Sequence, residues 1–425
     1  MTIDDHIAEG RLTAEANGNL GSDSHVVAGR RMTLRQGASR WVDNARAGEI
    51  GALPVVLALV VIAVIFQVQN DKFLSAQNLT NLIVQMAPVA IISLGIVFVL
   101  LIGEIDLSVG VVSGVGGVII ARLLLPDGNE LPWFIALLIA GLIAVAIGGF
   151  HGLLVAKLGV PSLIVTLATL FIGTGAVLAL AGQQGLIRVQ DDRVIGIANT
   201  FLSDLQGWTV AAVAIALYAV SQFVGDQTNL RQGLTTQSWK AYLVKVAVAA
   251  LVAFVTVAVT NADRGFPLIG LILGLATLGW LVIAERTRFG RHIYAVGGNE
   301  EAARRAGINV DRIKISCFMI ASFMAAFGGL VLASRLRSVD NSAGGGNLLL
   351  NAIAAAVIGG TSLFGGRGKV TSAVQGGLVI ASVESGMGLL GWSSDRKFIV
   401  TGCILLLAVT IDTVTRRTRQ SSGRA

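Results

Sequence analysis

Long apolar runs, separated by short polar or glycine-rich connections, fill most of the chain. Most runs extend over 17 to 25 residues, and a helix of that length, at about 1.5 Å per residue, crosses a hydrocarbon core about 30 Å thick. The pattern therefore predicts an all-α polytopic membrane protein with about 10 to 12 transmembrane helices. The predicted helices lie near residues 52–68, 79–102, 107–125, 133–157, 162–182, 208–224, 241–260, 266–284, 312–334, 347–364, 370–389 and 397–413.

Glycine or proline interrupts two of the apolar stretches, residues 79–125 and 347–389. Irregular backbone is tolerated at membrane depth where protein or a water-filled cavity covers it. We therefore expect broken or re-entrant segments in both stretches. Glycine accounts for 52 of the 425 residues, and small residues allow membrane helices to approach closely, so we expect a tightly packed bundle.

The composition excludes soluble enzymes, disordered tails and disulfide scaffolds. Hydrophobic residues make up 54% of the chain and charged residues 13%, whereas soluble proteins average about 25% charged residues. The mean hydropathy is +0.76. Cys317 and Cys403 both lie in apolar runs, where a thiol packs as a small hydrophobic group. We expect no disulfide, metal site, cofactor or catalytic residue.

Basic residues are distributed unevenly among the connections. With the N-terminus in the cytoplasm, 23 of the 32 lysines and arginines of a twelve-helix chain lie on the cytoplasmic side. The positive-inside rule thus predicts that both termini are cytoplasmic. The net charge of +7 favours anionic lipid headgroups, and no nucleic acid is expected as a partner.

The same pattern predicts three parts of the chain. Residues 1–50 form a basic cytoplasmic arm with too few apolar residues to build a core. Residues 51–415 form the transmembrane domain. Residues 416–425 form a short basic cytoplasmic tail.

The most basic connection, residues 285–311, predicts a short cytoplasmic helix. Asn299 is a favourable N-cap, and two glutamates follow it where the helix dipole favours negative charge. Gly297 and Gly298 predict a preceding turn, and Gly307 predicts the end of the helix. The helix and its caps comprise Asn299, Glu300, Glu301, Ala302, Ala303, Arg304, Arg305, Ala306 and Gly307.

Ala302, Ala303 and Ala306 of this helix share one face by helical spacing, and arginines flank that face. A helix this short is marginally stable alone in water, so we expect it to dock in a groove of a partner protein. The alternative is an ordinary basic loop that follows the positive-inside rule. His292 has no acid or cysteine at ligand spacing and is expected to be a loop or interface residue.

Four motifs together resemble one family. They are RFGRHIYAVGGNEEAARRAGI at 288–308, AIAAAVIGGTSLFGGRG at 352–368, IDLSVG at 105–110 and VPSLIVTLAT at 160–169. In combination they resemble the permease subunits of bacterial sugar-importing ABC transporters of the ribose and xylose type, over about residues 79–415. ESGMGLL at 384–390, with LLAVTID at 406–412, is more similar to the xylose branch.

The resemblance implies a dimeric permease whose 299–307 helix docks on a cytoplasmic ATP-binding subunit. It also implies a soluble sugar-binding protein that delivers the sugar from outside. The chain itself should not hydrolyse ATP, and it contains no Gly-x-x-x-x-Gly-Lys-[Ser/Thr] phosphate loop. The sequence differs from the family pattern at Asn351, where members often have an acidic residue, so the resemblance does not fix the sugar.

Polar residues near two glycine-rich junctions, 103–110 and 359–368, are candidates for the sugar pathway. Ionisable groups at membrane depth are costly and mark pathways or structural pairs, although Asp106 or Ser108 at the first junction could instead cap the next helix. A neutral monosaccharide needs only neutral donors and acceptors from its lining. The pathway candidates are Glu104, Asp106, Ser108, Asn351, Thr361 and Ser362.

Two other classes of protein were weighed. A twelve-helix secondary transporter of the major facilitator type is the main alternative, because residues 285–291 loosely resemble a basic loop of that superfamily. The equivalent connection, 103–106, contains no arginine, which argues against it. A membrane-embedded enzyme would need a metal cluster or a nucleophile with its base. The nearest feature, Asp191-Asp192, is isolated and is expected to be a solvated charge pair in an outer loop.

Overall fold

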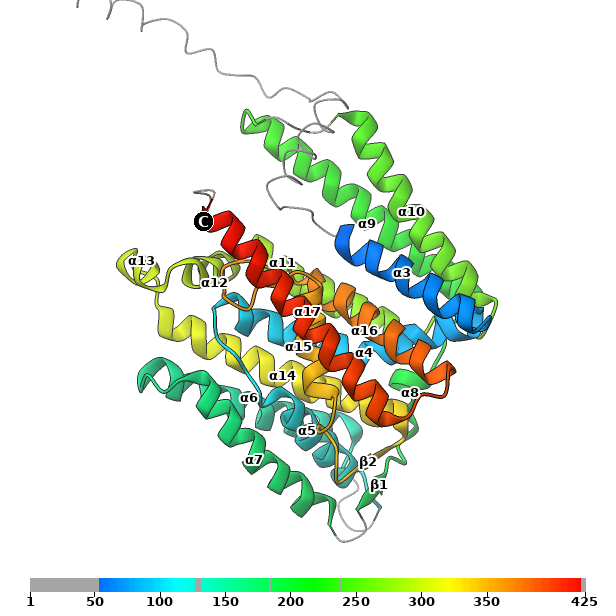
Figure 1. The fold of residues 1–425 in the computed structure, drawn as a ribbon, viewed down its shortest axis with the longest axis vertical. Coiled ribbons are helices and arrows are strands. Elements are labelled where there is room, and N and C mark those ends of the chain that lie inside the picture. Colours follow the sequence, from blue (N-terminus) through cyan, green and yellow to red (C-terminus); the bar gives the residue numbers. More distant parts are fainter. Residues whose placement is uncertain (1–52, 127–130, 183–184, 235, 237, 422–425) are drawn as a thin grey trace, which may run out of the picture. The chain divides into compact units, whose positions relative to one another are not determined.

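The computed structural model describes residues 53–126, 131–182, 185–234, 236 and 238–421. The predicted arm 1–50 lies outside these residues. The described residues divide into two compact units: Thr209–Val255 belongs to the smaller, and the described residues up to Trp208 together with those from Thr256 onward belong to the larger. Helices dominate both units (Figure 1).

The elements of the chain follow in order. They are α3 (Leu53–Gln69), α4 (Ala76–Leu101), α5 (Val109–Leu123), α6 (Trp133–Lys157), α7 (Ser162–Ala181), β1 (Leu186–Arg188), α8 (Asp192–Asn199), α9 (Asp204–Arg231), α10 (Trp239–Asn261), α11 (Leu268–Arg286), α12 (Arg288–Gly298), α13 (Glu300–Arg305), α14 (Val310–Leu336), β2 (Ser338–Asp340), α15 (Leu348–Ile358), α16 (Thr371–Leu389) and α17 (Ser394–Ser421).

Each of the twelve predicted apolar runs coincides with a helix, which confirms the all-α membrane class. Among the described residues, seven helices are long and apolar enough by themselves to cross a membrane, namely α4, α6, α7, α9, α10, α11 and α14. The helices α5 and α15 have 15 and 11 residues, and they lie in the two glycine-interrupted stretches. The run 347–364 therefore forms a shorter helix than its length predicts, because the chain leaves the helix at Gly359-Gly360, where Gly360 has a positive φ.

Proline sets the start of three helices. Pro132, Pro161 and Pro267 occupy the N-cap positions of α6, α7 and α11. The missing N–H of proline costs no helical hydrogen bond at that position, and its ring disfavours the helical conformation of the residue before it, so that the helix does not extend backwards. Helices α6 and α7 begin at the predicted residues, 133 and 162, and α11 begins two residues later than its predicted run.

The core of the larger unit is built around α4 and α14. Helix α14 packs against α4, α5, α6 and α8, while α4 also packs against α11, α15 and α16 (Figure 1). In their most apolar windows, 83% of α4 and 61% of α14 are buried by protein, compared with 22% of α6 and α7. The central pair is therefore surrounded by other helices, and α6 and α7 leave most of their apolar surface for lipid.

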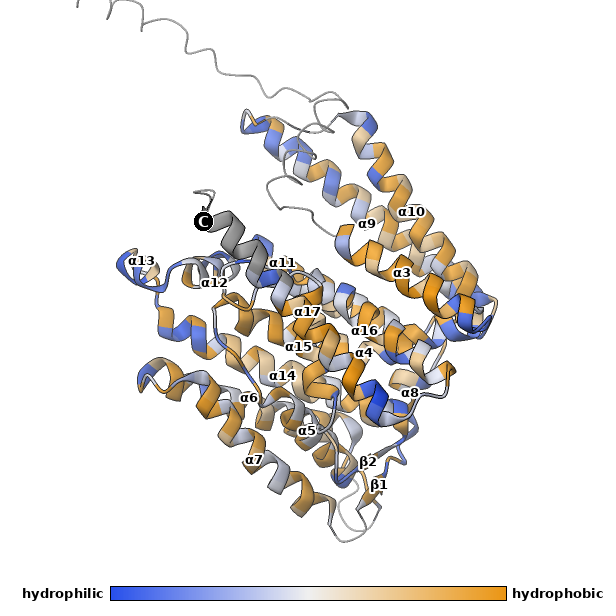
Figure 2. Cartoon of the chain, viewed as in Figure 1, coloured by the Kyte–Doolittle hydropathy of each residue, from blue (hydrophilic) through white to orange (hydrophobic). Residues whose placement is uncertain are grey.

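Hydrophilic residues lie at the ends of the helices of this core (Figure 2). Figure 2 shows them on α13 and on the adjoining start of α14, whereas α6 and α7 are largely hydrophobic along their length. Helix α14 ends at Arg337, which has a left-handed φ of 56°. A short antiparallel pair follows there, with Leu186 opposite Asp340 and Arg188 opposite Ser338.

The pair β1–β2 and the helix α8 were not predicted. Asp191-Asp192 was expected to be a solvated charge pair, and the structure corrects this for Asp191. Its carboxylate is the N-cap of α8 and accepts the N–H groups of Arg193 and Val194 at 2.9 and 3.0 Å. Helix α8 is fixed to α14 because Ser334 Oγ accepts the N–H of Ala198 at 2.9 Å.

The described part of the smaller unit is a helical hairpin made from the end of α9 and the beginning of α10. The Tyr242 hydroxyl donates to the Ala219 carbonyl at 3.1 Å, and the rings of Trp239 and Tyr242 stack with centroids 5.0 Å apart. Helix α9 continues to Arg231, so it is longer than the predicted run 208–224. At the other end of the chain, α17 continues to Ser421 and includes the first residues of the predicted tail.

Candidate functional site

The short helix that the sequence predicts between Asn299 and Gly307 is α13. Asn299 is its N-cap, and the side-chain oxygen accepts the N–H of Ala302 at 2.8 Å. Gly307 follows the helix with φ +82°, as expected for a C-terminal stop. One detail was wrong: Gly297 and Gly298 end the preceding helix α12 and do not form a free turn. Asn299 thus separates two consecutive helices, and its extended backbone sets the angle between them.

The three alanines of α13 differ in their exposure to solvent. Ala303 is only 4% exposed and belongs to the protein core, whereas Ala302 and Ala306 are exposed. Two i, i+4 ion pairs run along the helix, Glu300 with Arg304 and Glu301 with Arg305. Ala303 therefore anchors the helix, and its exposed side presents two small residues between charged ones.

An ion-pair network fastens α13 to the bundle. Lys314 Nζ lies 2.9 Å from Glu300 Oε2 and 2.9 Å from Glu104 Oε1. The side chain of Lys314 is 11% exposed and that of Glu104 17%, so solvent screens this pair less than a surface pair. Lys314 thereby links α13, α14 and the connection between α4 and α5.

Asp311 extends the network at the start of α14. Its carboxylate lies 2.8 Å from Lys157 Nζ, at the end of α6, and 3.5 Å from Arg304. Burial alone would raise the pKa of Glu300, but hydrogen bonds and charge interactions with Lys314 and Arg304 outweigh that effect and lower the pKa below its ordinary value. Glu300 is therefore held in its charged form.

Two glycine-rich connections, 102–108 and 359–370, meet the end of α12. The N–H of Gly366 donates to the Leu101 carbonyl at 2.8 Å. A Cβ on Gly297 would lie 1.7 Å from that carbonyl oxygen, so only glycine permits this approach. Gly365 packs in the same way against Gly103, and the Tyr294 hydroxyl donates to the Gly368 carbonyl at 3.0 Å. We call α12, α13, the start of α14 and the connections 102–108 and 359–370 the coupling end.

The structure separates the six pathway candidates. Glu104 is part of the ion-pair network at the coupling end. Thr361 and Ser362 lie in the connection 359–370, also at the coupling end. Thr361 is buried, and the Ser362 hydroxyl donates to the Asp412 carboxylate at 3.2 Å. Asp106 is buried and accepts both the N–H and the hydroxyl of Ser108, at 2.8 and 2.6 Å. Asp106 therefore orders the turn that leads into α5, and Ser108 occupies the N-cap position of α5 without a capping hydrogen bond from its own side chain.

Asn351 lies apart from the other five candidates, on α15. Its side-chain nitrogen donates to Glu384 Oε1 of α16 at 2.5 Å, and its side-chain oxygen is buried with no partner among the described residues. The carboxylate of Glu384 also lies close enough to Arg335 of α14 for their charges to interact. A buried polar cluster thus joins α14, α15 and α16.

Comparison with known proteins identifies the family. A family model described as "Branched-chain amino acid transport system / permease component" matches residues 78–409. The chain belongs to this family of permeases. The xylose transport system permease protein of Escherichia coli K12 is 37% identical over 365 residues, which cover 85% of this chain and 92% of that permease. No solved structure matches the chain.

Two further relatives agree with the family. The xylose transport system permease protein of Haemophilus influenzae is 36% identical over 365 residues, 85% of this chain and 96% of that protein. The ribose import permease protein of Escherichia coli K12 is 30% identical over 357 residues, 84% of this chain and 92% of that protein. The similarity to the xylose branch is thus confirmed, and a secondary transporter is not favoured. The permease is a non-catalytic, multi-pass component of the bacterial inner membrane that works with ATP-binding and substrate-binding partners.

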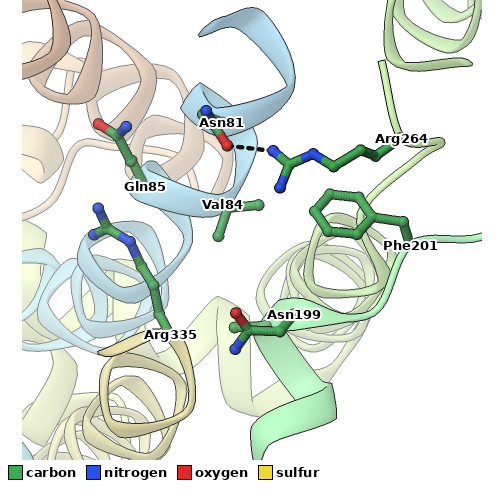
Figure 3. A pocket seen from close by; sticks show the side chains of 8 residues that line it. Asn81, Val84, Gln85, Asn199, Phe201, Arg264 and Arg335 are labelled. Carbon is green, nitrogen blue, oxygen red and sulfur yellow. Dashed lines mark hydrogen bonds between the residues drawn. The ribbon is translucent and has the colours of Figure 1, made fainter. Parts of the chain in front are cut away.

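Sequence reasoning missed several functional candidates of the permease. Lys314, Arg335 and Glu384 are charged residues at the edge of or within apolar runs, and an ionisable residue in such a run is itself a signal. Sequence alone gives no indication of their partners, because Lys314 and Glu104 are 210 positions apart. It also missed a cavity of about 290 Å³ lined by Gln85 and Arg335 (Figure 3), which we call the distal cavity.

Proposed function

We propose that this permease is the membrane subunit of an ATP-driven importer of a monosaccharide, with a preference for a xylose-like pentose. In this proposal α13 receives the conformational change of a separate ATP-binding subunit. The observation that carries the coupling role is the network of Lys314, Glu300 and Glu104, which ties an exposed helix to two buried parts of the bundle. The identity to xylose permeases supports the choice of sugar.

The charge distribution supports a cytoplasmic location for the coupling end. The basic side chains of Lys157, Arg304 and Lys314 meet there, together with the basic connections 285–314 and 367–369. Positive charge near membrane ends is typical of cytoplasmic connections. An ATP-binding subunit would accordingly approach α13 from the cytoplasm.

Movement of α13 would pass into the bundle by two routes. Glu300 is tied through Lys314 to Glu104, so that a displaced helix pulls the connection that leads into α5. Close backbone packing of Gly297 against Leu101 couples α12 to the end of α4. Contiguous, closely packed contacts of this kind transmit motion because they leave little room for local relaxation.

The exposed part of α13 defines the expected docking contacts. Ala302 and Ala306 are small, and Glu301 and Arg305 beside them are the most exposed charged pair of the helix, with side chains 76% and 77% exposed. A partner groove that accepts this surface would exclude a larger side chain at Ala302. Ala303 is an anchor to the chain itself and is therefore unsuited to such a test.

Reconstituted transport tests the proposal. The permease is placed in proteoliposomes with its candidate ATP-binding subunit and sugar-binding protein, and uptake of radiolabelled xylose, ribose and glucose is measured with and without ATP. We expect uptake only when both partners and ATP are present, with xylose preferred. Uptake by the chain alone, driven by a sugar or ion gradient, would contradict the proposal and restore the secondary transporter.

A pair of variants isolates the role of α13. Ala302→Arg should abolish ATP-driven uptake and co-purification of the ATP-binding subunit, while the protein still inserts and elutes as a single species. Ala302→Ser is the matched control, because it keeps the residue small, and should transport at the normal rate. Normal uptake by Ala302→Arg would show that α13 is an ordinary surface loop.

We also propose that two copies of the permease form the transport unit. The resemblance to sugar permeases supports a homodimer, and a soluble sugar-binding protein would then dock across both copies. The mass of the detergent-solubilised complex tests this directly. A complex with one permease per assembled transporter, active in uptake, would rule out the dimer.

A further inference from the structure

The distal cavity lies between α4, α8 and α14, away from the coupling end. Gln85 is 16 residues from Leu101 along α4, which corresponds to about 24 Å at 1.5 Å per residue. Figure 3 shows Gln85 and Arg335 on one side of the cavity, with Phe201 and Arg264 across from them. The cavity is lined by Asn81, Val84, Gln85, Ala198, Asn199, Phe201, Arg264 and Arg335.

Part of the lining is fixed by hydrogen bonds within the protein. Asn199 donates to the carbonyls of Ser334 and Ile195, at 2.8 and 2.9 Å. Arg264 donates to the side-chain oxygen of Asn81 at 2.6 Å, and its guanidinium lies 4.4 Å from the centre of the Phe201 ring. These side chains therefore form a rigid rim, in which few groups must be ordered when a ligand binds.

Two half-buried lining residues differ from the rim. Gln85 and Arg335 form no hydrogen bond or ion pair to any residue of the described part of the chain. An amide side chain offers two donors and one acceptor, and a guanidinium offers five donors. Both side chains line the cavity and have no partner in the described part of the chain, so their donors and the amide acceptor are available to a molecule in the cavity.

The charges around the cavity favour a neutral ligand. Arg264 is paired with Asp263, with Nε and Oδ2 3.0 Å apart, and Arg335 has Glu384 as its acidic neighbour. Each arginine is thus balanced by a carboxylate, and the cavity presents hydrogen-bond donors without an excess of positive charge. A polyhydroxylated neutral molecule matches this arrangement better than an anion does.

The size of the cavity is also informative. Its volume of about 290 Å³ is just below the range of about 300 to 1,000 Å³ that is typical of small-molecule sites. A single sugar ring is a small ligand with hydroxyls around its edge and apolar C–H faces. Val84 and Phe201 provide apolar surface for such faces, and the polar residues provide partners for the hydroxyls.

We propose that the distal cavity is a binding site of the permease for a neutral monosaccharide, in which Gln85 and Arg335 hydrogen-bond the sugar hydroxyls. This inference rests on the proposed function, because it assigns the sugar to one place in the transporter. The site lies at the end of the bundle opposite α13. The sugar would therefore be held there before the coupling end moves, next to the buried cluster of Glu384 and Asn351.

Cysteine protection tests the site without any partner protein. Cys403 is exposed and is first replaced by serine, while Cys317 is buried and remains. Gln85→Cys is introduced into this background in nanodiscs, and its alkylation by a water-soluble thiol reagent is timed with and without D-xylose, D-ribose or D-glucose. We expect at least one neutral sugar to slow the reaction about tenfold at saturation. The matched control is Lys72→Cys, at an exposed position before α4, and its alkylation rate should not change.

Three outcomes would overturn the proposal. Absence of protection by every sugar, at concentrations raised at least tenfold to allow for the hydrogen bond lost with Gln85, excludes a sugar site, as does equal slowing at Lys72→Cys. Stronger protection by an anionic sugar acid than by the neutral sugars would identify an anion site. Protection by the sugar-free binding protein, but not by sugar, would identify a protein contact instead.

Transport assays then separate this inference from the proposed function. In the complete reconstituted system at saturating binding protein, Gln85→Ala should reduce the uptake rate up to about tenfold, the effect of losing one neutral hydrogen bond, and Lys72→Ala should not. Protection by sugar without any ATP-driven uptake would support the site and contradict the proposed function. If ATP-driven uptake is unchanged in Gln85→Ala and sugar does not protect Gln85→Cys, the site is contradicted and the proposed function still holds.

Discussion

The two ends of α14 are built in opposite ways. At the coupling end, every charged side chain of α13 has a partner, and glycines of two connections and of α12 bring backbone into direct contact with backbone. At the distal cavity, about 290 Å³ is open and Gln85 and Arg335 have no hydrogen-bond partner among the described residues. One end is closed by its own interactions, and the other leaves donors for a ligand.

This difference shows how one helix could serve two tasks. A region that passes on a mechanical signal needs contacts that yield little, which charge pairs of low exposure and glycine packing provide. A region that binds a passing solute needs a fixed rim and a few unpaired polar groups. Helix α14 joins both regions through a continuous backbone from Lys314 to Arg335.

The largest expected effect comes from removing the glycine packing at the coupling end. Gly297→Ala places a Cβ 1.7 Å from the Leu101 carbonyl oxygen, and overpacking typically costs about 1 to 3 kcal/mol. Because backbone atoms must move here, we expect about 3 kcal/mol and loss of ATP-driven uptake. Thermal unfolding in detergent and uptake assays measure both quantities.

The neighbouring glycine supplies the control for this substitution. A Cβ on Gly298 meets no atom within 4 Å, so Gly298→Ala should change the free energy of unfolding by less than about 0.5 kcal/mol. Equal effects of the two substitutions would mean that close backbone packing is not what distinguishes the coupling end.

The next effect tests the ion-pair network. Lys314→Met leaves Glu104 without its partner at 17% exposure, and removing one member of a buried pair costs about 3 to 5 kcal/mol. Glu300, the second partner of Lys314, is more exposed, at 44%. We therefore expect Lys314→Met to lower the free energy of unfolding by about 2 kcal/mol, less than for a fully buried pair, as measured by thermal unfolding. Arg305→Met breaks the exposed pair with Glu301 and should cost less than about 1 kcal/mol. Similar costs for both variants would show that the network adds no rigidity.

A smaller effect is expected from pH. The pKa of Glu300 is lowered from its ordinary 4.5, so its contribution to stability is fully present above pH 4.5 and is lost as the pH falls through the lowered pKa. Wild type should therefore be more stable than Glu300→Gln at neutral pH, and the difference should shrink as the pH falls below 4.5. A difference that stays constant, or grows on acidification, would contradict the charge pairing of Glu300 with Lys314.

The two ends also differed in how well sequence predicted them. The helix α13 was predicted because its signals are local: the N-cap Asn299 and its bond to Ala302 lie three residues apart. The apolar runs predicted the helices for the same reason. The ion pairs that hold α13 in place were not predicted, because Glu104 and Lys314 come together only in the folded bundle.

The distal cavity was missed entirely, since its lining comes from four separated segments. Gln85 lies inside an apolar run, and Phe201 and Arg264 lie in connections that carry no motif. Helix α8 was also missed, because it has only eight residues and is partly polar. Its hydrogen bond to α14 joins Ala198 to Ser334, which is 136 positions away in the sequence. Local patterns thus predicted the elements, and long-range partners determined the sites.

The smallest expected effect concerns α8, which carries Asn199 to the distal cavity. Asp191→Ala removes the N-cap that accepts two backbone N–H groups, and loss of a cap costs typically about 1 kcal/mol. Asp192→Ala is the matched control, because Asp192 lies in the first turn and is not the N-cap residue, and it should cost less than about 0.5 kcal/mol.

If the rim is rigid because α8 is fixed, Asp191→Ala should also weaken the protection of Gln85→Cys by sugar, whereas Asp192→Ala should not. Full protection in Asp191→Ala would mean that α14 and α4 alone define the cavity.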